Sequence, residues 1–232
     1  MSEPGNLSAL GPSTRLPRFT RGERWVHRSL GLLMGGCLVT AAMLSTPTLS
    51  ELIGRRFIVS RIHIACGLML PLPIVLGLLL SPAFRADVRR LNRFSPSDRR
   101  WLKSKAWRSS RLRIGKFNAG QKLNAAFVLG GVMVMLGTGF IMWRNEYWPV
   151  AWRTGATFVH DWLALGLLIV IVGHMVMASR DGEARTGMRE GDVDRGWAAR
   201  EHPVWAAEVE AELEAQLTAT SELNPARTPP EA

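Results

Sequence analysis

Cysteine is scarce in this chain, and the scarcity excludes several kinds of site. The 232 residues include only two cysteines, Cys37 and Cys66, and each lies inside an apolar run. No CxxCH motif is present, so covalent attachment of a c-type haem is not indicated, and no CxxC pair offers a zinc or redox-dithiol site. We therefore interpret both thiols as small apolar packing groups.

Acidic residues are also few. The chain has 19 Asp and Glu against 29 Lys and Arg, which gives a formal net charge of +10. A basic excess of this size is compatible with nucleic-acid binding. The basic residues, however, flank apolar runs and form no recognisable nucleic-acid module, so we do not expect nucleic acid as a partner. In a membrane protein such an excess more often records orientation.

The apolar residues gather in four long runs and are not spread at amphipathic spacing. A run of about 20 apolar residues spans the hydrocarbon of a bilayer. Such a run must be helical, because the backbone has no other hydrogen-bond partner in lipid. The sequence therefore predicts an all-α membrane protein, a four-transmembrane-helix bundle in which Pro71 and Pro73 kink the second helix. The predicted spans are residues 25–45, 60–80, 122–143 and 157–178.

The segments outside this bundle domain, residues 25–178, are polar or basic. Residues 1–24 are predicted to be a loose cytoplasmic tail, and no signal peptide stands out. The loop between the second and third spans is predicted to be a basic connection with short helices. Residues 179–215 are predicted to be a cytoplasmic segment with a turn and an amphipathic helix, and residues 216–232 a disordered tail.

The distribution of Lys and Arg predicts the orientation of the bundle. The N-terminal region up to Arg28, the long middle loop and the segment after Ala178 together carry 24, and the two remaining loops carry five. Positive residues accumulate on the cytoplasmic side. Both termini and the middle loop are therefore expected in the cytoplasm, which agrees with an even number of spans.

Four of the five histidines lie in the predicted spans, where ionisable residues are costly and are functional candidates. With the orientation above, His27 and His174 lie near the inner face, and His63 and His160 near the outer face. Each layer therefore allows one pair. The two histidines of the fourth span are 14 residues apart, roughly 21 Å along the helix axis, and lie within about 40° of the same face.

Two histidines on opposite sides of a macrocycle are the axial ligands of a b-type haem, and the interior of a helix bundle accommodates the ring. The layers therefore predict two non-covalent b haems stacked across the bilayer. Zinc or copper fits less well, because each layer offers only two strong ligands. The alternative is four unrelated polar residues at helix contacts.

Glycines and arginines near the histidines allow two interpretations each. Gly31, Gly35, Gly36, Gly67, Gly166 and Gly173 lie in the spans. They leave room for a flat porphyrin, but close packing between membrane helices uses the same residues. Arg24, Arg28 and Arg61 lie at the water boundary, where they could pair with haem propionates or serve as ordinary interfacial anchors.

A polar cluster, GKFNAGQKLN at residues 115–124, precedes the third span at the depth of His27 and His174. The amides of Asn118 and Gln121 could hydrogen-bond a quinone carbonyl. Chemistry alone favours the simpler interpretation, a helix N-terminus with polar entry.

Four features together resemble one family: RFTRGERWVHR at residues 18–28, GKFNAGQKLN at 115–124, the two histidines of the fourth span, and WAAREHPVW at 197–205. The chain resembles the gamma subunits of membrane-bound respiratory formate dehydrogenases, which are dihaem cytochromes b within the wider set of cytochrome b561-like membrane anchors. The resemblance covers about residues 15–210. It implies a multi-pass protein of the bacterial inner membrane.

The resemblance implies that His63 and His160 hold an outer haem and that His27 and His174 hold an inner one. It also implies a menaquinone site beside the inner haem, at Asn118, Gly120 and Gln121. The implied partners are an iron–sulfur beta subunit and a periplasmic molybdenum or tungsten catalytic alpha subunit. Electrons would pass from the beta subunit through both haems to menaquinone, while substrate oxidation stays with the partner.

One position departs from the family pattern. Two adjacent histidines are expected before Pro203, where this chain has Glu201 and His202. The departure bears on the partner contact more than on the haems. Two other functions stay open: a b561-like cytochrome serving another oxidoreductase, and a haem-free membrane anchor.

Overall fold

The structure is a computed structural model that describes residues 14–46, 48–49, 54–104 and 113–223. Residues 1–13 of the predicted N-terminal tail and 224–232 of the predicted C-terminal tail lie outside the described residues. The described chain is almost entirely helical, which confirms the predicted all-α class.

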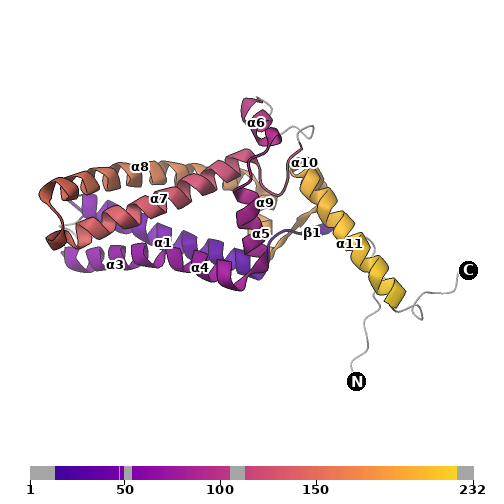
Figure 1. Cartoon of the computed structure of the whole chain (residues 1–232), viewed down its shortest axis with the longest axis horizontal. Helices are drawn as coiled ribbons and strands as arrows, with labels where there is room; N and C mark the ends of the chain where they lie inside the picture. Colours follow the sequence, from indigo (N-terminus) through magenta and orange to yellow (C-terminus); the bar gives the residue numbers. More distant parts are fainter. Residues whose placement is uncertain (1–13, 47, 50–53, 105–112, 224–232) are drawn as a thin grey trace, which may run out of the picture.

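Four long apolar helices form the bundle (Figure 1). Their most apolar stretches have mean hydropathies between 1.4 and 2.2, and each helix is long enough to cross a membrane. Their apolar side chains face outward: Leu32 is 78% exposed and Leu80 is 76% exposed, as lipid contact requires. The helices are α1 (Arg21–Ser45), α3 (Arg56–Met69) continued by α4 (Pro71–Leu80), α7 (Ala119–Trp143) and α8 (Val150–Arg180).

The first helix begins earlier than predicted, at Arg21 rather than residue 25. The reason is a capping box: the Thr20 hydroxyl accepts from the backbone N–H of Glu23, and the Glu23 carboxylate accepts from the backbone N–H of Thr20 at 2.6 Å. This exchange satisfies two free N–H groups of the first turn. Residues 21–24 therefore belong to the bundle and not to the tail.

The second span is interrupted at its prolines. Helix α3 ends at Met69 and α4 begins at Pro71, with Leu70 between them still in helical conformation. A proline at this position cannot donate the next helical hydrogen bond, which explains the break. Gly77 of α4 lies so close to α1 that a Cβ there would approach Val26 to 2.7 Å.

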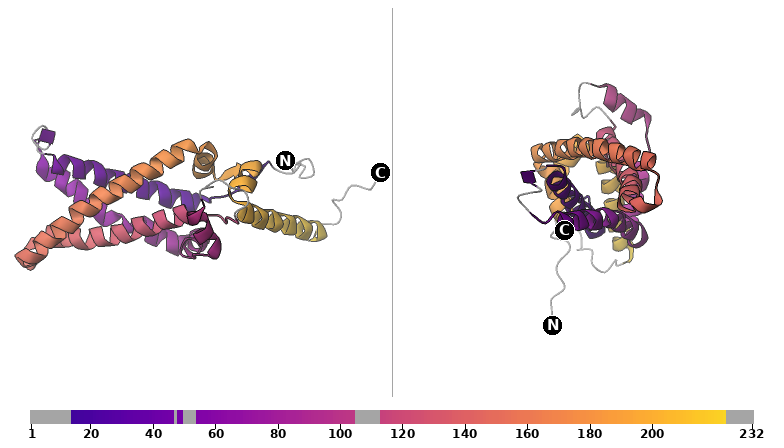
Figure 2. Two further views of the ribbon diagram at one scale, coloured as in Figure 1. Left: turned by 90° about the horizontal axis from the view of Figure 1, so that it is seen from above. Right: turned by 90° about the vertical axis from the view of Figure 1, so that its left-hand side faces the viewer.

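The bundle consists of two helical hairpins. Helix α1 packs along α3 and α4, and α7 packs along α8, whereas the contacts between the two hairpins are fewer. Seen from its end, the bundle arranges these helices around a common axis (Figure 2). The widest separation is therefore between hairpins, and this is where histidines of α1 and α3 face those of α8.

Short elements gather at one end of the bundle, which we call the inner end; the opposite end is the outer end. Helix α5 (Pro82–Leu91) follows α4, and α6 (Pro96–Lys103) precedes α7. The other elements of the inner end are β1 (Arg15–Pro17), α9 (Gly182–Glu190), β2 (Asp192–Asp194), α10 (Arg195–Glu201) and α11 (Pro203–Leu223).

A small hydrophobic core holds the inner end together. Strands β1 and β2 pair antiparallel with Leu16 opposite Val193, and both side chains are buried against Trp197, Trp205 and neighbouring alanines. Residues 15–17 thus form a strand within the stretch predicted to be a loose tail, because Leu16 has this apolar partner. Helix α11 likewise continues to Leu223, into the stretch predicted to be disordered.

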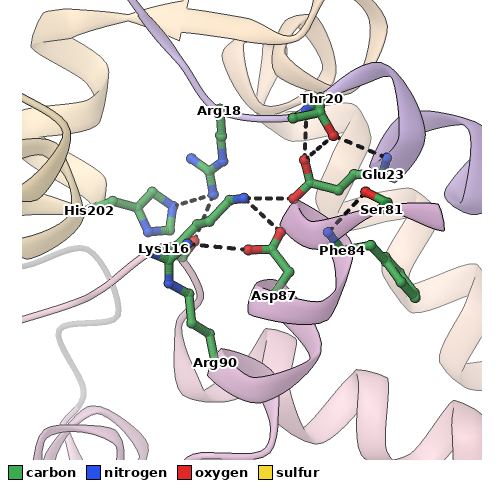
Figure 3. Close-up of polar contacts among 9 residues, drawn as sticks. All are labelled: Arg18, Thr20, Glu23, Ser81, Phe84, Asp87, Arg90, Lys116 and His202. Atoms are coloured by element: carbon green, nitrogen blue, oxygen red, sulfur yellow. Dashed lines mark hydrogen bonds and ion pairs between the residues drawn. The ribbon is translucent and has the colours of Figure 1, made fainter. Parts of the chain in front are cut away.

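A buried polar cluster joins these elements to the bundle (Figure 3). The Lys116 ammonium lies 3.0 Å from a Glu23 carboxylate oxygen and 2.6 Å from one of Asp87. Arg18 donates to the Lys116 carbonyl at 3.1 Å and lies 3.0 Å from His202 Nε2. Four parts of the chain therefore meet at one charged site: the N-terminal segment, α5, the segment before α7 and the C-terminal region.

Burial shifts the acidity of this polar cluster. It raises the pKa of Asp87 to about 7, with the adjacent Glu23 carboxyl acting in the same direction. Burial, together with the charge of Arg18, lowers the pKa of His202 to about 3, so this imidazole is neutral at physiological pH. Burial also lowers the pKa of Arg18 to about 10.

Candidate functional site

The structure brings the four membrane histidines together as the two predicted pairs. His63 of α3 faces His160 of α8 with ring centroids 6.3 Å apart, and we call these residues the outer pair. His27 of α1 faces His174 of α8 with centroids 6.2 Å apart, and we call these the inner pair. Helix α8 thus supplies one histidine to each layer.

The separation within each pair fits two ligands of one metal. Imidazole nitrogens bind first-row metals at about 2.0 Å, and a ring centroid lies about 1.1 Å behind its nitrogen, so two imidazoles on opposite sides of one iron have centroids about 6.2 Å apart. A direct N–H···N bond would bring them to about 5.2 Å. Both pairs match the first distance and are too wide for the second.

Glycines beside the histidines leave space for a flat ring. Gly31 and Gly35 follow His27 at intervals of four residues, so they continue its helix face, and Gly67 follows His63 in the same way. A Cβ at any of these three positions would meet nothing within 4 Å. Close helix packing therefore does not account for these three glycines, whereas a macrocycle beside the histidines does.

Other glycines do make close contacts. A Cβ at Gly36 would lie 3.0 Å from the Cys66 sulfur, and one at Gly139 would lie 3.3 Å from Cε1 of His160. Gly36 thus serves helix packing, and Gly139 makes room for the His160 ring itself. The two interpretations left open by the sequence apply to different glycines.

Each ring of the outer pair also contacts a threonine on the neighbouring helix. Thr40 of α1 lies 2.9 Å from His63 Nδ1, and Thr138 of α7 lies 2.9 Å from His160 Nδ1. Sequence reasoning missed both threonines. The available signal was a threonine within an apolar span, at the depth of a histidine on the adjacent span.

The arginines near the histidines have partners inside the chain. Arg24 and Arg28 of α1 both donate to the carbonyl of Arg189 in α9, and the bond from Arg28 is 3.0 Å long. These bonds join α9 to α1. The Arg61 guanidinium lies over the Phe57 ring, 4.5 Å from its centroid. Anchoring accounts for all three arginines, and the exposed positions of Arg28 and Arg61 leave propionate contacts open to these two.

The cluster before the third span is a helix cap. The Asn118 side-chain oxygen accepts from the backbone N–H of Gln121, and the Gln121 side-chain oxygen accepts from that of Asn118, both at 2.9 Å. Each carboxamide thus uses its oxygen in the cap and keeps its NH₂ group for other acceptors. Gly120, between them, lies beneath Trp101 of α6, where a Cβ would approach the indole to 3.0 Å.

The remaining candidates have structural partners. Lys122 pairs with Asp98 at 2.8 Å and donates to the Arg93 carbonyl at 2.8 Å, which ties α6 to α7. His202 is buried, with Nδ1 2.8 Å from the Gly115 carbonyl, so it packs within the chain's own inner end. Among the described residues, no three His, Cys, Asp or Glu side chains gather as a metal site.

Comparison with known proteins agrees with this arrangement. A family model described as prokaryotic cytochrome b561 matches residues 18–186. The cytochrome b556 subunit of nitrate-inducible formate dehydrogenase from Escherichia coli K12 is 36% identical over 100 residues, which are 42% of this chain and 46% of the relative. The cytochrome b556 subunit of formate dehydrogenase from Haemophilus influenzae is 34% identical over 107 residues, 44% of this chain and 45% of the relative.

A second Escherichia coli K12 relative, the fdo-type cytochrome b556 subunit of formate dehydrogenase, is 32% identical over 98 residues, 41% of this chain and 46% of the relative. The chain thus spans about half the length of the curated relatives it matches. With four membrane-spanning helices and these relatives, it is a multi-pass protein of the bacterial inner membrane.

Proposed function

Because the chain belongs to the prokaryotic cytochrome b561 family, whose members bind haem b, we propose that it is the dihaem cytochrome b subunit of a respiratory dehydrogenase of the formate dehydrogenase type. In this proposal the chain passes electrons from a periplasmic iron–sulfur partner to menaquinone at the cytoplasmic side. The oxidation of the substrate belongs to a molybdenum or tungsten partner subunit.

One observation carries the proposal: two histidine pairs at two depths, each with a ring separation that would suit two ligands of one metal ion. His63 and His160 would hold one haem, and His27 and His174 the other. When bound, each haem supplies a reversible one-electron couple. Helix α8 fixes the spacing of the two sites, because both of its histidines are part of one uninterrupted helix.

The charge distribution supports the side assigned to each site. The inner end carries the middle loop and the C-terminal segment, which hold most of the Lys and Arg residues. The inner pair is then on the cytoplasmic side and the outer pair faces the periplasm. A periplasmic donor would deliver electrons at the outer pair, so transfer toward the inner pair moves negative charge into the cell.

The helix cap at Asn118 is the proposed quinone contact. The NH₂ groups of Asn118 and Gln121 are donors held in place by the cap, and Gln121 is exposed at the N-terminus of α7. Donors at a helix N-terminus stabilise negative charge that develops on a quinone carbonyl. Gly120, covered by Trp101, would contribute shape rather than a hydrogen bond.

Two other functions make different predictions. A haem-free anchor has no need for histidine pairs at a metal-ligand separation, or for glycines with open space on the same helix face. A b561-like cytochrome of another oxidoreductase would share both features and differ only in its donor. The names of the curated relatives favour the formate dehydrogenase type.

The test is purification of the native complex from the membrane, with identification of its subunits and a reduced-minus-oxidised spectrum. We expect two acid-extractable b haems per chain and iron–sulfur and molybdenum or tungsten partners, and we expect formate to reduce both haems. A haem-free chain would leave only the anchor function. Two haems that dithionite reduces and formate does not would leave the cytochrome of another oxidoreductase.

A further inference from the structure

The outer pair is held by the same arrangement twice. On each side a threonine of the neighbouring helix places its hydroxyl oxygen 2.9 Å from the histidine Nδ1. His63 receives this contact from Thr40, and His160 receives it from Thr138. The two threonines come from different hairpins, so the repetition does not arise from one local backbone feature.

Each of the two threonine hydroxyls has a carbonyl oxygen of its own helix within hydrogen-bond distance. Thr40 Oγ1 lies 2.6 Å from the Gly36 carbonyl, and Thr138 Oγ1 lies 2.9 Å from the Val134 carbonyl, both on their own helices. A carbonyl oxygen only accepts, so each hydroxyl donates there. With its proton directed at the carbonyl of its own helix, as is usual for a threonine inside a helix, each hydroxyl oxygen accepts from the Nδ1 of its histidine partner.

His63 shows the same direction a second way. Its Nδ1 also lies 3.2 Å from the Cys37 carbonyl, which cannot donate. Nδ1 of both outer histidines therefore carries the proton, and Nε2 keeps the lone pair that a metal requires. The neighbouring helices thus select the metal-binding tautomer.

The inner pair lacks this arrangement. In the part of the chain that the structure describes, no hydrogen bond joins the ring of His27 or His174 to another residue. A ligand imidazole whose N–H donates to an acceptor is a stronger base. A more basic ligand stabilises ferric over ferrous iron, so the hydrogen-bonded pair favours a lower potential.

We propose that Thr40 and Thr138 are positioning residues that fix the tautomer of the outer ligands and lower the potential at the outer site relative to the inner one. The inference rests on the proposed function, because it needs a haem between the outer histidines. A lower potential at the outer site favours electron transfer toward the inner site, the direction proposed above.

The two threonines are not equivalent. His63 keeps the Cys37 carbonyl as an acceptor when Thr40 loses its hydroxyl. His160 has no other hydrogen-bond acceptor for its ring among the described residues. Thr138→Val should therefore have the larger effect, and Thr40→Val the smaller one.

The experiment is a spectroelectrochemical redox titration of the full-length haem-loaded protein, with the low-field EPR signals of both haems recorded in parallel. Thr138→Val should raise the potential of one haem by about 59 mV, which is a tenfold change in the ferric-to-ferrous equilibrium of a one-electron couple. The shifted haem should be the one that His160→Ala removes.

Two matched variants serve as controls. Thr138→Ser keeps the hydroxyl and should restore the wild-type potential. Thr154→Val removes a hydroxyl of α8 that bonds to the Val150 carbonyl at 3.0 Å in the same way but has no histidine partner, and it should change neither haem. A general effect of losing a helix-bonded hydroxyl would appear in Thr154→Val as well.

The outcomes separate this inference from the proposed function. A wild-type protein without two b haems overturns both. With both haems present, an unshifted potential in Thr138→Val overturns the inference alone, as does an equal shift in Thr154→Val or a shift of the other haem. If Thr138→Val loses the outer haem, retention in Thr138→Ser supports the inference, and loss there too overturns it.

Discussion

The outer and inner pairs have nearly equal ring separations, 6.3 Å and 6.2 Å, in very different surroundings. The outer pair lies among apolar helices and is held by two hydroxyls. The inner pair lies toward the inner end, which also holds the arginines of α1, the buried polar cluster of Lys116 and the amides of the α7 cap. In the proposed function, the separation lets each pair hold a haem iron, and the surroundings set the potential of that haem.

The largest expected effect is in reporter fusions that test which side of the membrane each end of the bundle faces. A reporter active only in the periplasm should work when fused after residue 150, near the outer end. It should be inactive after residue 100 or residue 190, at the inner end. Activity after residue 100 would invert the orientation and exchange the roles of the two pairs.

The next largest effect is the loss of stability expected when a buried charge is removed at the inner end. Lys116→Met leaves the buried carboxylates of Glu23 and Asp87 without their ammonium, which should cost about 3–5 kcal/mol of stability. The inner haem should be lost before the outer one, because the cluster joins α5 to the start of α1, the helix that carries His27. Thermal unfolding in detergent, followed at both haem bands, measures this.

Arg195→Met is the matched control, since it removes a solvent-accessible, half-buried pair with Glu210 at 2.6 Å. It should change the Tm little, because solvent-accessible ion pairs contribute little. Equal losses of stability in the two variants would show that the buried cluster has no special role at the inner end.

The third largest effect is expected from removing the side-chain amides of the α7 cap. Asn118→Ala or Gln121→Ala should leave both haems reducible and slow their reoxidation by a menaquinone analogue about 10- to 150-fold, from the loss of roughly 1.5–3 kcal/mol of hydrogen bonding. Stopped-flow reoxidation of the inner haem measures the effect. Asn118→Asp is a useful comparison, because it keeps the capping oxygen and removes the NH₂ donor.

A purely structural cap predicts a different result. Asn118→Asp would then reoxidise at the wild-type rate, and the alanine variants would lose about 1 kcal/mol of stability without slower turnover. Unaltered reoxidation in the double alanine variant, with both haems present, would place the quinone elsewhere.

The smallest effect concerns pH. Burial lowers the pKa of His202 to about 3, so the unfolded chain binds a proton more readily than the folded chain below about pH 6.5. This contribution to stability is full above pH 6.5 and should fall by about 1.4 kcal/mol at pH 5.5. The raised pKa of Asp87 acts oppositely, since it adds stability as the pH falls from 7.

A comparison of wild type with His202→Asn isolates the histidine, because the contribution of Asp87 is common to both. The difference in free energy of unfolding should narrow between pH 8 and pH 5.5. A constant difference over that range would mean that His202 titrates normally and is not buried against Arg18.

The spans and the pairing were predictable from the sequence, whereas the details of each pair were not. Hydropathy locates a membrane helix, and a fixed rise per residue places His160 and His174 at two depths. The contacts of Thr40 and Thr138 with the histidines were not predicted, because a hydroxyl in a membrane helix usually bonds its own backbone. Their second contact depends on helix rotation, which hydropathy does not determine.

The inner end shows the same limit. Leu16 and Val193 pair although most of the chain lies between them in sequence, and no local sequence pattern predicts such a contact. The first turn of α1 was within reach, because Thr20 and Glu23 have capping-box spacing. Asn118 and Gln121 have the same spacing, which is why chemistry alone favoured a helix start there.

The histidines should act as two pairs across the hairpins. The direct measurement is the haem content and reduced-minus-oxidised spectrum of the four single His→Ala variants. His27→Ala and His174→Ala should remove one and the same spectral component, and His63→Ala and His160→Ala should remove the other. Depletion of the same component by His27→Ala and His63→Ala would contradict the pairing and, with it, the roles proposed for the inner and outer pairs.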